Sequence, residues 1–276
     1  MTQTKPTLVI GATGKIGSRV LTRLEASGIP ARAASRRSAP AFDWTDAATW
    51  APVLAGADVA FVSYVPDLAA KGAPDVIAAF ADAARAAGIK RVVLLSGRGE
   101  ANAQQSEAIM ANSGLGCTVV RASWFFQNFS EGVLQPAVLS GLIAMPAAQR
   151  REPFIHADDI ADVAVAALTD PRHAGEIYEV TGPQLLTFGE AATMIGAAAG
   201  YRVDYAPISL EQFHAGLLPE VGPDYADMLT HLCSEVFDGR NETLGNGVQR
   251  ALGREPRDFA SFCAEIAAAG AWSKAA

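Results

Sequence analysis

A glycine-rich turn near the start of the chain constrains its fold more than any other feature. Residues 8–17 read LVIGATGKIG, an apolar run typical of a buried strand that breaks into a glycine turn and then opens a helix. Glycine allows positive φ and close backbone approach, and a helix start presents free N–H groups. A second short strand, ARAAS, follows the helix. This order predicts a dinucleotide pyrophosphate site, made by Gly11, Thr13, Gly14, Lys15, Ile16 and Gly17. The alternative is a tight turn that holds no ligand.

Further strand patterns alternate with helix patterns along the first half of the chain. Apolar runs cover 58–64, 91–96 and 117–121, and helical patterns cover 73–87 and 104–113. We therefore expect an α/β fold with a Rossmann-type doubly wound parallel sheet. After residue 121 the pattern is less regular, and capping boxes at Thr187-x-x-Glu190 and Ser209-x-x-Gln212 predict two helices. We expect a dinucleotide-binding domain over 1–155 and a small, mostly helical substrate lobe over 156–276, interleaved with the Rossmann core.

Composition and charge exclude several classes of protein. The net charge of −7 and the pI near 5.1 argue against non-specific nucleic-acid binding, which needs a positive field. The N-terminus lacks the pattern of a signal peptide, and no apolar run approaches the roughly 20 residues that span a bilayer. Cys117, Cys233 and Cys263 are widely spaced and form no metal-ligand pattern. We expect a cytoplasmic protein with no membrane partner, no nucleic-acid partner and no metal.

The end of the second strand bears on which dinucleotide binds. An acidic residue there binds the ribose hydroxyls of NAD, whereas a basic residue accommodates the 2′-phosphate of NADP. The chain has Ser35, Arg36 and Arg37 at this place, and a guanidinium can bind a phosphate through two hydrogen bonds. This favours NADP(H), with NAD(H) possible. The alternative is a solvated basic loop.

The chain resembles the NmrA-like branch of the atypical short-chain dehydrogenase/reductases over nearly its whole length. The resemblance rests on GATGKIG, SRR, FDWTDAATWAPVLAGAD, RVVLLSGRG, SEAIMANSGLGCTVVRASWFFQNF, FIHADDIADVAVAAL and ALGREPRDFASFCAEIAAAGAW. It implies a Rossmann domain with a small C-terminal substrate lobe. It also implies NAD(P)H-dependent quinone or azo-type reductases, tailoring reductases of secondary metabolism, or sensors that bind the dinucleotide without turnover. The FDW…TW loop is similar to one in ergot alkaloid reductases, and the resemblance places Asp43 and Trp44 beside the adenine.

One departure from the related extended reductases concerns the proton donor. Those enzymes use Tyr-x-x-x-Lys, in which the lysine lowers the pKa of the tyrosine. None of the lysines of this chain lies four residues after a tyrosine. The sequence therefore does not support ordinary alcohol oxidation.

Candidate catalytic and substrate residues follow the ends of the predicted strands. Ser63 and Tyr64 follow the third strand, Ser96 ends the fourth, and an aromatic run follows the fifth. We expect Ser63 at the cofactor, Tyr64 to stack on a flat substrate or donate a proton, and Ser96 to hydrogen-bond a substrate carbonyl. His156 is a candidate proton source near neutral pH. The predicted substrate residues are Trp124, Phe125, Phe126 and, by the resemblance, Asn128.

Each of these residues has a structural alternative. Tyr64 and at least one of the three aromatic residues can be packing residues, Asn128 a helix cap, and His156 a buried histidine bonded to the backbone. Asp158 is expected to cap a helix whose apolar face contains Ile160 and Val163.

Three functions remain open at the level of the sequence. The leading hypothesis is an NAD(P)H-dependent reductase that passes hydride to a planar, apolar, conjugated or quinone-like small molecule. A tailoring step of secondary metabolism is one setting for this reaction. Such acceptors need little acid catalysis, which agrees with the missing Tyr-x-x-x-Lys pair. The alternatives are a non-catalytic NADP(H) sensor and an oxygenation or isomerisation enzyme with the same fold.

Overall fold

The computed structural model describes residues 5–273, which form two compact units. The first unit runs to Ala122 and also takes in Asp158–Val180 and Asn246–Arg254. The second unit consists of Ser123–Ala157, Thr181–Gly245 and the chain from Glu255 onward. The chain returns twice to the first unit, at Asp158 and at Asn246, where it adds β8 (Ile177–Val180), α6 (Ala157–Thr169) and α10 (Gly247–Leu252). The expected lobe over 156–276, interleaved with the Rossmann core, stays a prediction.

A six-stranded parallel sheet forms the centre of the first unit, with the strand order β2-β1-β3-β4-β5-β8. Its strands are β1 (Thr7–Ile10), β2 (Ala31–Ala34), β3 (Val59–Val62), β4 (Arg91–Gly97), β5 (Gly116–Ala122) and β8 (Ile177–Val180). The chain steps from β1 to β2 on one side and to β3 on the other, so the strand order reverses at β1. The expected Rossmann-type α/β fold is confirmed, and ligands of such sheets bind at the carboxyl edge near this reversal.

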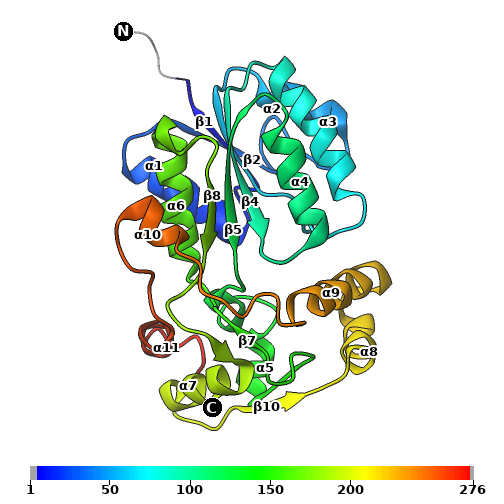
Figure 1. The fold of residues 1–276 in the computed structure, drawn as a ribbon, viewed down its shortest axis with the longest axis vertical. Helices are drawn as coiled ribbons and strands as arrows, with labels where there is room; N and C mark the ends of the chain where they lie inside the picture. The colour runs from blue at the N-terminus through cyan, green and yellow to red at the C-terminus, as the bar shows by residue number, and fades with distance from the viewer. Residues whose placement is uncertain (1–4, 274–276) are drawn as a thin grey trace. The chain divides into compact units, whose positions relative to one another are not determined.

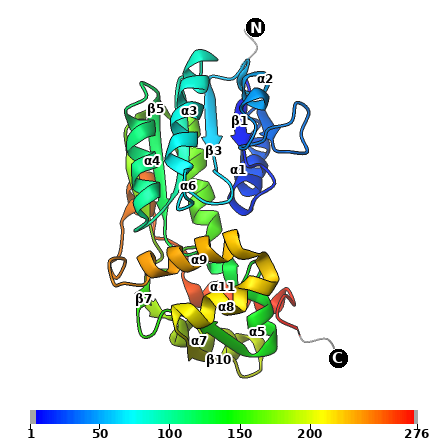
Figure 2. The same ribbon diagram turned by 90° about the vertical axis from the view of Figure 1, so that its right-hand side faces the viewer.

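Helices cover both faces of this sheet, as Figures 1 and 2 show, with α1 and α6 on one face and α3 and α4 on the other. The helices of this unit are α1 (Lys15–Ala26), α2 (Trp50–Leu54), α3 (Ala73–Ala86), α4 (Ala101–Ala111), α6 (Ala157–Thr169) and α10 (Gly247–Leu252). Helix α1 ends before Gly28, whose φ of +69° places it in the left-handed region. The predicted apolar face of α6 is buried, including Ile160 and Val163.

The second unit contains five helices and two small sheets among its described residues. They are α5 (Gln135–Ser140), β6 (Leu142–Met145), β7 (Arg151–Glu152), β9 (Leu186–Thr187), α7 (Phe188–Ala199), β10 (Asp204–Pro207), α8 (Leu210–Val221), α9 (Pro223–Val236) and α11 (Phe259–Ala268). Strands β6 and β10 pair in parallel, and β7 and β9 pair antiparallel. Both predicted capping boxes are confirmed: the side chains of Thr187 and Ser209 accept from the third-position amides of α7 and α8.

Aromatic side chains form the core of the second unit. Phe126 packs at 4.9 Å from Phe259 between ring centroids, and Phe154 packs edge-on against Phe188 at 5.2 Å. The indole N–H of Trp272 donates to the carbonyl of Phe129 at 2.9 Å. This hydrogen bond joins the chain that follows α11 to the aromatic core. Rings of this size bury much apolar area per residue, which suits a unit with little sheet. Within residues 5–273, no helix is long and apolar enough to cross a membrane.

Candidate cofactor and catalytic site

The glycine turn after β1 is built around two positions that exclude any larger residue. Gly11 has a φ of +81°, and the amide of Gly14 donates to its carbonyl at 2.9 Å. A Cβ atom on Gly17 would lie only 2.2 Å from the carbonyl oxygen of Gly11. Helix α1 can therefore pack directly against the turn only because residue 17 has no side chain.

The start of α1 is suited to an anion. Gly14 is the N-cap residue, and no side chain caps the helix there. Thr13 and Gly14 are exposed, whereas Ile16 points into the core and is buried. The N–H groups at a helix start carry the positive end of the helix dipole. The turn and the helix start therefore fit a pyrophosphate, and they would hold it through backbone amides.

Ser35, Arg36 and Arg37 leave the carboxyl end of β2 in an exposed turn. The carbonyl of Ser35 accepts from the amides of Ser38 and Phe42, and its hydroxyl accepts from the amide of Arg37. Both guanidinium groups are exposed, and neither forms an ion pair within residues 5–273. They are therefore available to an anion that lies at the end of β2.

Asp43 and Trp44 lie in the loop between β2 and α2. The amide and hydroxyl of Thr45 donate to the Asp43 carboxylate and lower its pKa, with a further contribution from the charge of Arg36. The Trp44 ring is buried against Phe42 and Tyr64, and its indole N–H donates to the carbonyl of Ser63 at 3.2 Å. The structure thus gives Trp44 a packing role, and its contact with an adenine stays a prediction.

Ser63 and Tyr64 follow β3 at the strand-order reversal. Ser63 lies against the glycine turn, because a Cβ atom on Gly11 would be 3.0 Å from the Cβ of Ser63. Tyr64 is half-buried, its ring centroid is 5.0 Å from that of Trp44, and burial raises the pKa of its phenol. A raised pKa keeps the phenol protonated, so Tyr64 can donate a hydrogen bond at neutral pH. The structure brings both residues to the glycine turn.

Ser96 is held by a buried ion-pair network that the sequence analysis did not find. Its hydroxyl donates to the Glu107 carboxylate of α4 at 2.6 Å. Arg121 of β5 donates to both oxygens of Glu107 and to Glu179 of β8, and the bond to Glu107 is the main cause that raises the pKa of Arg121. The only proton of the Ser96 hydroxyl is therefore directed at Glu107. A donor role toward a substrate carbonyl stays a prediction and would require this bond to break.

The second unit contains the predicted aromatic residues. Phe126 is buried in its core, which agrees with the structural alternative for one of the three. Trp124 and Phe125 are half-buried, and the ring of Trp124 packs against Phe188 and Phe237. Asn128 lies in a short 3-10 turn, where its backbone N–H donates to the carbonyl of Phe125.

His156 is buried in the second unit beside Gln127, a residue that the sequence analysis missed. The side-chain oxygen of Gln127 accepts from the amide of Ala157 at 2.8 Å, so its NH₂ group faces His156, with Nε2 of the imidazole at 3.1 Å. Because an amide nitrogen only donates, the imidazole nitrogen that it faces must accept. The imidazole also makes edge contacts with the rings of Phe126 and Phe262. The local sequence provided no signal for this pair, because Gln127 and His156 lie 29 positions apart.

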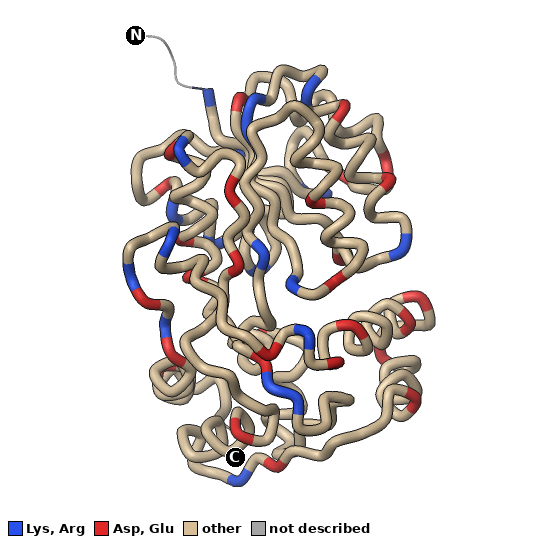
Figure 3. Tube along the Cα trace, in the orientation of Figure 1, with Lys and Arg blue, Asp and Glu red and all other residues tan. Residues whose placement is uncertain are grey.

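The acidic start of α6 differs from the expectation. The helix begins at Ala157, so Asp158 lies inside the first turn and does not cap it. Its carboxylate pairs with Arg19 and Arg23 of α1, and the buried Asp159 pairs with Arg254 at 2.7 Å. Figure 3 shows where acidic and basic residues lie along the chain. These carboxylates are already neutralised by arginines. Among residues 5–273, no group of three or more His, Cys, Asp or Glu could hold a metal ion.

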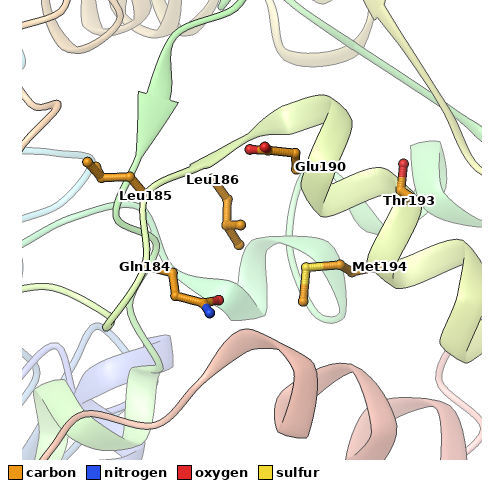
Figure 4. A pocket seen from close by; sticks show the side chains of 6 residues that line it. All are labelled: Gln184, Leu185, Leu186, Glu190, Thr193 and Met194. Carbon is orange, nitrogen blue, oxygen red and sulfur yellow. The ribbon is translucent and has the colours of Figure 1, made fainter.

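A surface pocket of about 610 Å³ lies in the second unit between β9 and α7 (Figure 4). Its lining comprises Gln184, Leu185, Leu186, Glu190, Thr193 and Met194. Glu190 belongs to the α7 capping box, and Arg151 lies 3.3 Å from its carboxylate. None of the predicted site residues lines this pocket. The cofactor residues with Tyr64 and Ser96 belong to the first unit, and His156 and the aromatic residues belong to the second.

Comparison with known proteins agrees with the glycine turn and the sheet. A family model described as NAD(P)H-binding matches residues 11–171, more than half of the chain. The chain belongs to this NAD(P)H-binding family. The cofactor prediction of a nicotinamide dinucleotide is therefore confirmed at the level of NAD(P)H.

Several characterised and uncharacterised oxidoreductases are similar to the chain over almost their whole length. The uncharacterised oxidoreductase YesF of Bacillus subtilis is 32% identical, with 97% of each chain covered. The NAD(P)H azoreductase of Xenophilus azovorans is 32% identical over 95% of this chain and 98% of its own. Agroclavine dehydrogenase of Claviceps fusiformis is 32% identical over 94% and 96%. Membership of an NAD(P)H-dependent oxidoreductase family is thus shown.

Two solved structures show the same fold at low sequence identity. The NADPH complex of the quinone oxidoreductase QOR2 from Escherichia coli has a TM-score of 0.78 at 22% identity, covering 94% of this chain and 99% of that one. NmrA, a negative transcriptional regulator in complex with NAD, has a TM-score of 0.73 at 16% identity, covering 97% of both chains. Both likenesses show that the expected fold is shared with these structures.

Proposed function

We propose that this NmrA-like protein is an NADPH-dependent reductase that passes hydride to an electrophilic, conjugated or quinone-like small molecule. The observation that carries the proposal is the glycine cradle of Gly11 and Gly17 at an uncapped helix start, with two exposed arginines at the end of β2. Two similar proteins are named as an azoreductase and an agroclavine dehydrogenase, which supports acceptors with polarised double bonds. The chain lacks a Tyr-x-x-x-Lys pair, which disfavours simple alcohols.

The residues of the first unit have separate tasks in this proposal. Backbone amides at Lys15 and Ile16, at the start of α1, hold the pyrophosphate, and Arg36 and Arg37 bind the 2′-phosphate. A bound dihydronicotinamide supplies the hydride. Ser63 and Tyr64 line the crevice at the strand-order reversal, where the half-buried phenol hydrogen-bonds the acceptor.

In the second unit, Trp124 and Phe125 offer half-buried aromatic faces to a planar, apolar acceptor, and Asn128 lies in the same turn. His156, a buried imidazole beside Gln127, is the candidate proton source of this unit. A tailoring step of secondary metabolism and a cytoplasmic location belong to the same proposal.

The test is NADPH oxidation by the purified protein, in air and without oxygen, with a panel of quinones, enones, azo compounds and iminium compounds. Oxidation that follows one acceptor in both atmospheres supports the reductase. Oxidation only in air contradicts it and indicates oxygen chemistry. Tight NADPH binding without turnover of any acceptor contradicts it and favours the non-catalytic NADP(H) sensor.

A further inference from the structure

The four tryptophans of the chain differ in what their indole N–H groups bind. Those of Trp44, Trp50 and Trp272 donate to backbone carbonyl oxygens at 2.7 to 3.2 Å. In the part of the chain that the structure describes, the indole N–H of Trp124 donates to no protein atom. The Trp124 ring is half-buried, and its nitrogen is open to solvent. Trp124 therefore has a donor that the fold does not use.

The backbone groups of Trp124, in contrast, both bind protein atoms. Its amide donates to Oε1 of Glu152 at 3.2 Å, and its carbonyl accepts from the amide of Ile155 at 2.8 Å. Glu152 and Ile155 are almost fully buried, so these bonds hold residue 124 in a fixed place. The side-chain N–H is thus the polar group of Trp124 that a ligand can meet.

Two buried rings fix the orientation of the Trp124 indole. The ring of Phe237 lies against it with 5.1 Å between centroids and 39° between planes, and the ring of Phe188 meets it edge-on at 5.9 Å. Phe188 and Phe237 also pack edge-on against each other at 5.3 Å. Phe188 starts α7 next to its capping box, and Phe237 follows α9. A donor that is held in place in advance loses little entropy when it binds a ligand.

The chemistry of an indole N–H selects between the acceptors of the proposed function. The group can donate a hydrogen bond but cannot accept one. The carbonyl oxygen of a quinone has lone pairs that accept such a bond, and it gains negative charge when hydride adds, so a fixed donor stabilises the transition state. The nitrogen of an iminium cation has no free lone pair and becomes neutral on reduction, so the donor does not stabilise it.

We propose that the indole N–H of Trp124 hydrogen-bonds the carbonyl oxygen of a neutral, quinone-like acceptor, and that the protein therefore prefers such acceptors to iminium cations. This inference rests on the proposed reductase function and narrows its substrate class. The acceptor gains two electrons and one proton as hydride, and the negative charge that results lies on the hydrogen-bonded oxygen. The indole keeps its proton, and water supplies the second proton of the hydroquinone.

The hydrogen bond can be observed without turnover by NMR of the indole N–H groups in the full-length protein saturated with NADP⁺. The Trp124 signal, assigned by its loss in Trp124→Phe, should exchange with solvent faster than the signals of the buried Trp50 and Trp272. Duroquinone should shift the Trp124 proton downfield and slow its exchange. N-methylquinolinium, a planar cation without a free lone pair, should do neither. A Trp124 signal that duroquinone leaves unchanged, or that N-methylquinolinium shifts and protects as much, overturns the proposal.

Two matched variants separate a ligand contact from a structural role. Trp124→Phe keeps an aromatic ring but removes the N–H, so kcat/KM for duroquinone should fall by about 10-fold, with the NADPH dissociation constant and the unfolding midpoint unchanged. Trp272→Phe removes an indole N–H that the carbonyl of Phe129 accepts. This control should lower the unfolding midpoint and leave kcat/KM unchanged.

The outcomes also distinguish this inference from the function on which it rests. Duroquinone reduction at the wild-type kcat/KM in Trp124→Phe overturns the hydrogen bond and leaves the reductase function standing. A wild type in which duroquinone shifts and protects the Trp124 signal, but which oxidises NADPH with no acceptor, overturns the reductase function instead.

Discussion

Gly17 of α1 lies so close to the carbonyl oxygen of Gly11 that a Cβ atom at residue 17 would be 2.2 Å away. The glycine spacing therefore has a steric cause that is independent of any ligand. The same contact sets the position of the helix start, and hence of the amides that would meet a pyrophosphate. Binding and stability are consequently coupled at this position.

Gly17→Ala should weaken both folding and NADPH binding. The added methyl group must displace the backbone of the turn, an overpacking cost of about 1–3 kcal/mol. Gly216→Ala is a suitable control, because no atom lies within 4 Å of its Cβ position in α8 and the change should stabilise by about 1 kcal/mol. Denaturant unfolding and a fluorescence titration with NADPH measure the two effects. Wild-type affinity in Gly17→Ala would contradict the assigned cradle.

Arg36→Ala should weaken NADPH binding selectively. Loss of a charge-assisted bond to the 2′-phosphate raises the NADPH dissociation constant by about 10- to 100-fold and leaves NADH unchanged. Arg85→Ala removes an equally exposed arginine from α3 and should affect neither cofactor. Calorimetric titration with both dinucleotides provides the comparison. Equal affinities for NADH and NADPH in the wild type, unchanged in the variant, would remove the NADP assignment.

Arg121→Met should destabilise the first unit strongly. The change leaves the buried Glu107 carboxylate with only the Ser96 hydroxyl, and breaking such a buried pair costs about 3–5 kcal/mol. A second change, Glu107→Gln, removes the uncompensated charge and should restore part of the loss. Arg85→Met breaks an exposed pair and should change the free energy of unfolding little. If the double variant were as unstable as Arg121→Met, the uncompensated charge would not be the cause.

The three thiols should make the protein less stable at alkaline pH. Burial raises the pKa of Cys117, Cys233 and Cys263 from 9.0 to about 12, with the charge of Glu107 adding to the shift at Cys117. Between these values the unfolded chain loses protons that the folded protein keeps. The contribution is thus fully present below about pH 9 and is lost as the pH rises toward 12, at up to about 1.4 kcal/mol per pH unit for each thiol.

Denaturant unfolding across this pH range measures the slope, and single Cys→Ala variants should each reduce it. The buried thiols should also react with a thiol reagent only when the protein unfolds. Rapid labelling of the native protein at neutral pH would show that the thiols are less protected than their burial indicates.

Local signals along the chain were sufficient for much of the fold. The glycine turn, the alternation of strands and helices, and both capping boxes predicted features that the structure contains, because each depends on residues close in sequence. The prediction that Asp158 caps α6 was wrong because the contacts of this residue are long-range. Asp158 has the local pattern of a cap, but its arginine partners lie 139 and 135 residues away in α1.

The same difference between short-range and long-range contacts decides which parts of the candidate site the sequence could predict. The cofactor cradle could be predicted because Gly11, Gly14 and Gly17 are neighbours in sequence. The contacts of Ser96 with Glu107 and of His156 with Gln127 could not, because they join residues far apart in sequence.

The sequence by itself determined the α/β class, the NAD(P)H-binding turn and the family, because these follow from backbone requirements and short-range patterns. Only the tertiary structure decided which polar side chains are already paired. Hydrogen bonds and ion pairs between distant residues depend on strand order and register, and the chain returns to the first unit at Asp158 and Asn246 to complete them. Short-range sequence patterns do not predict that return.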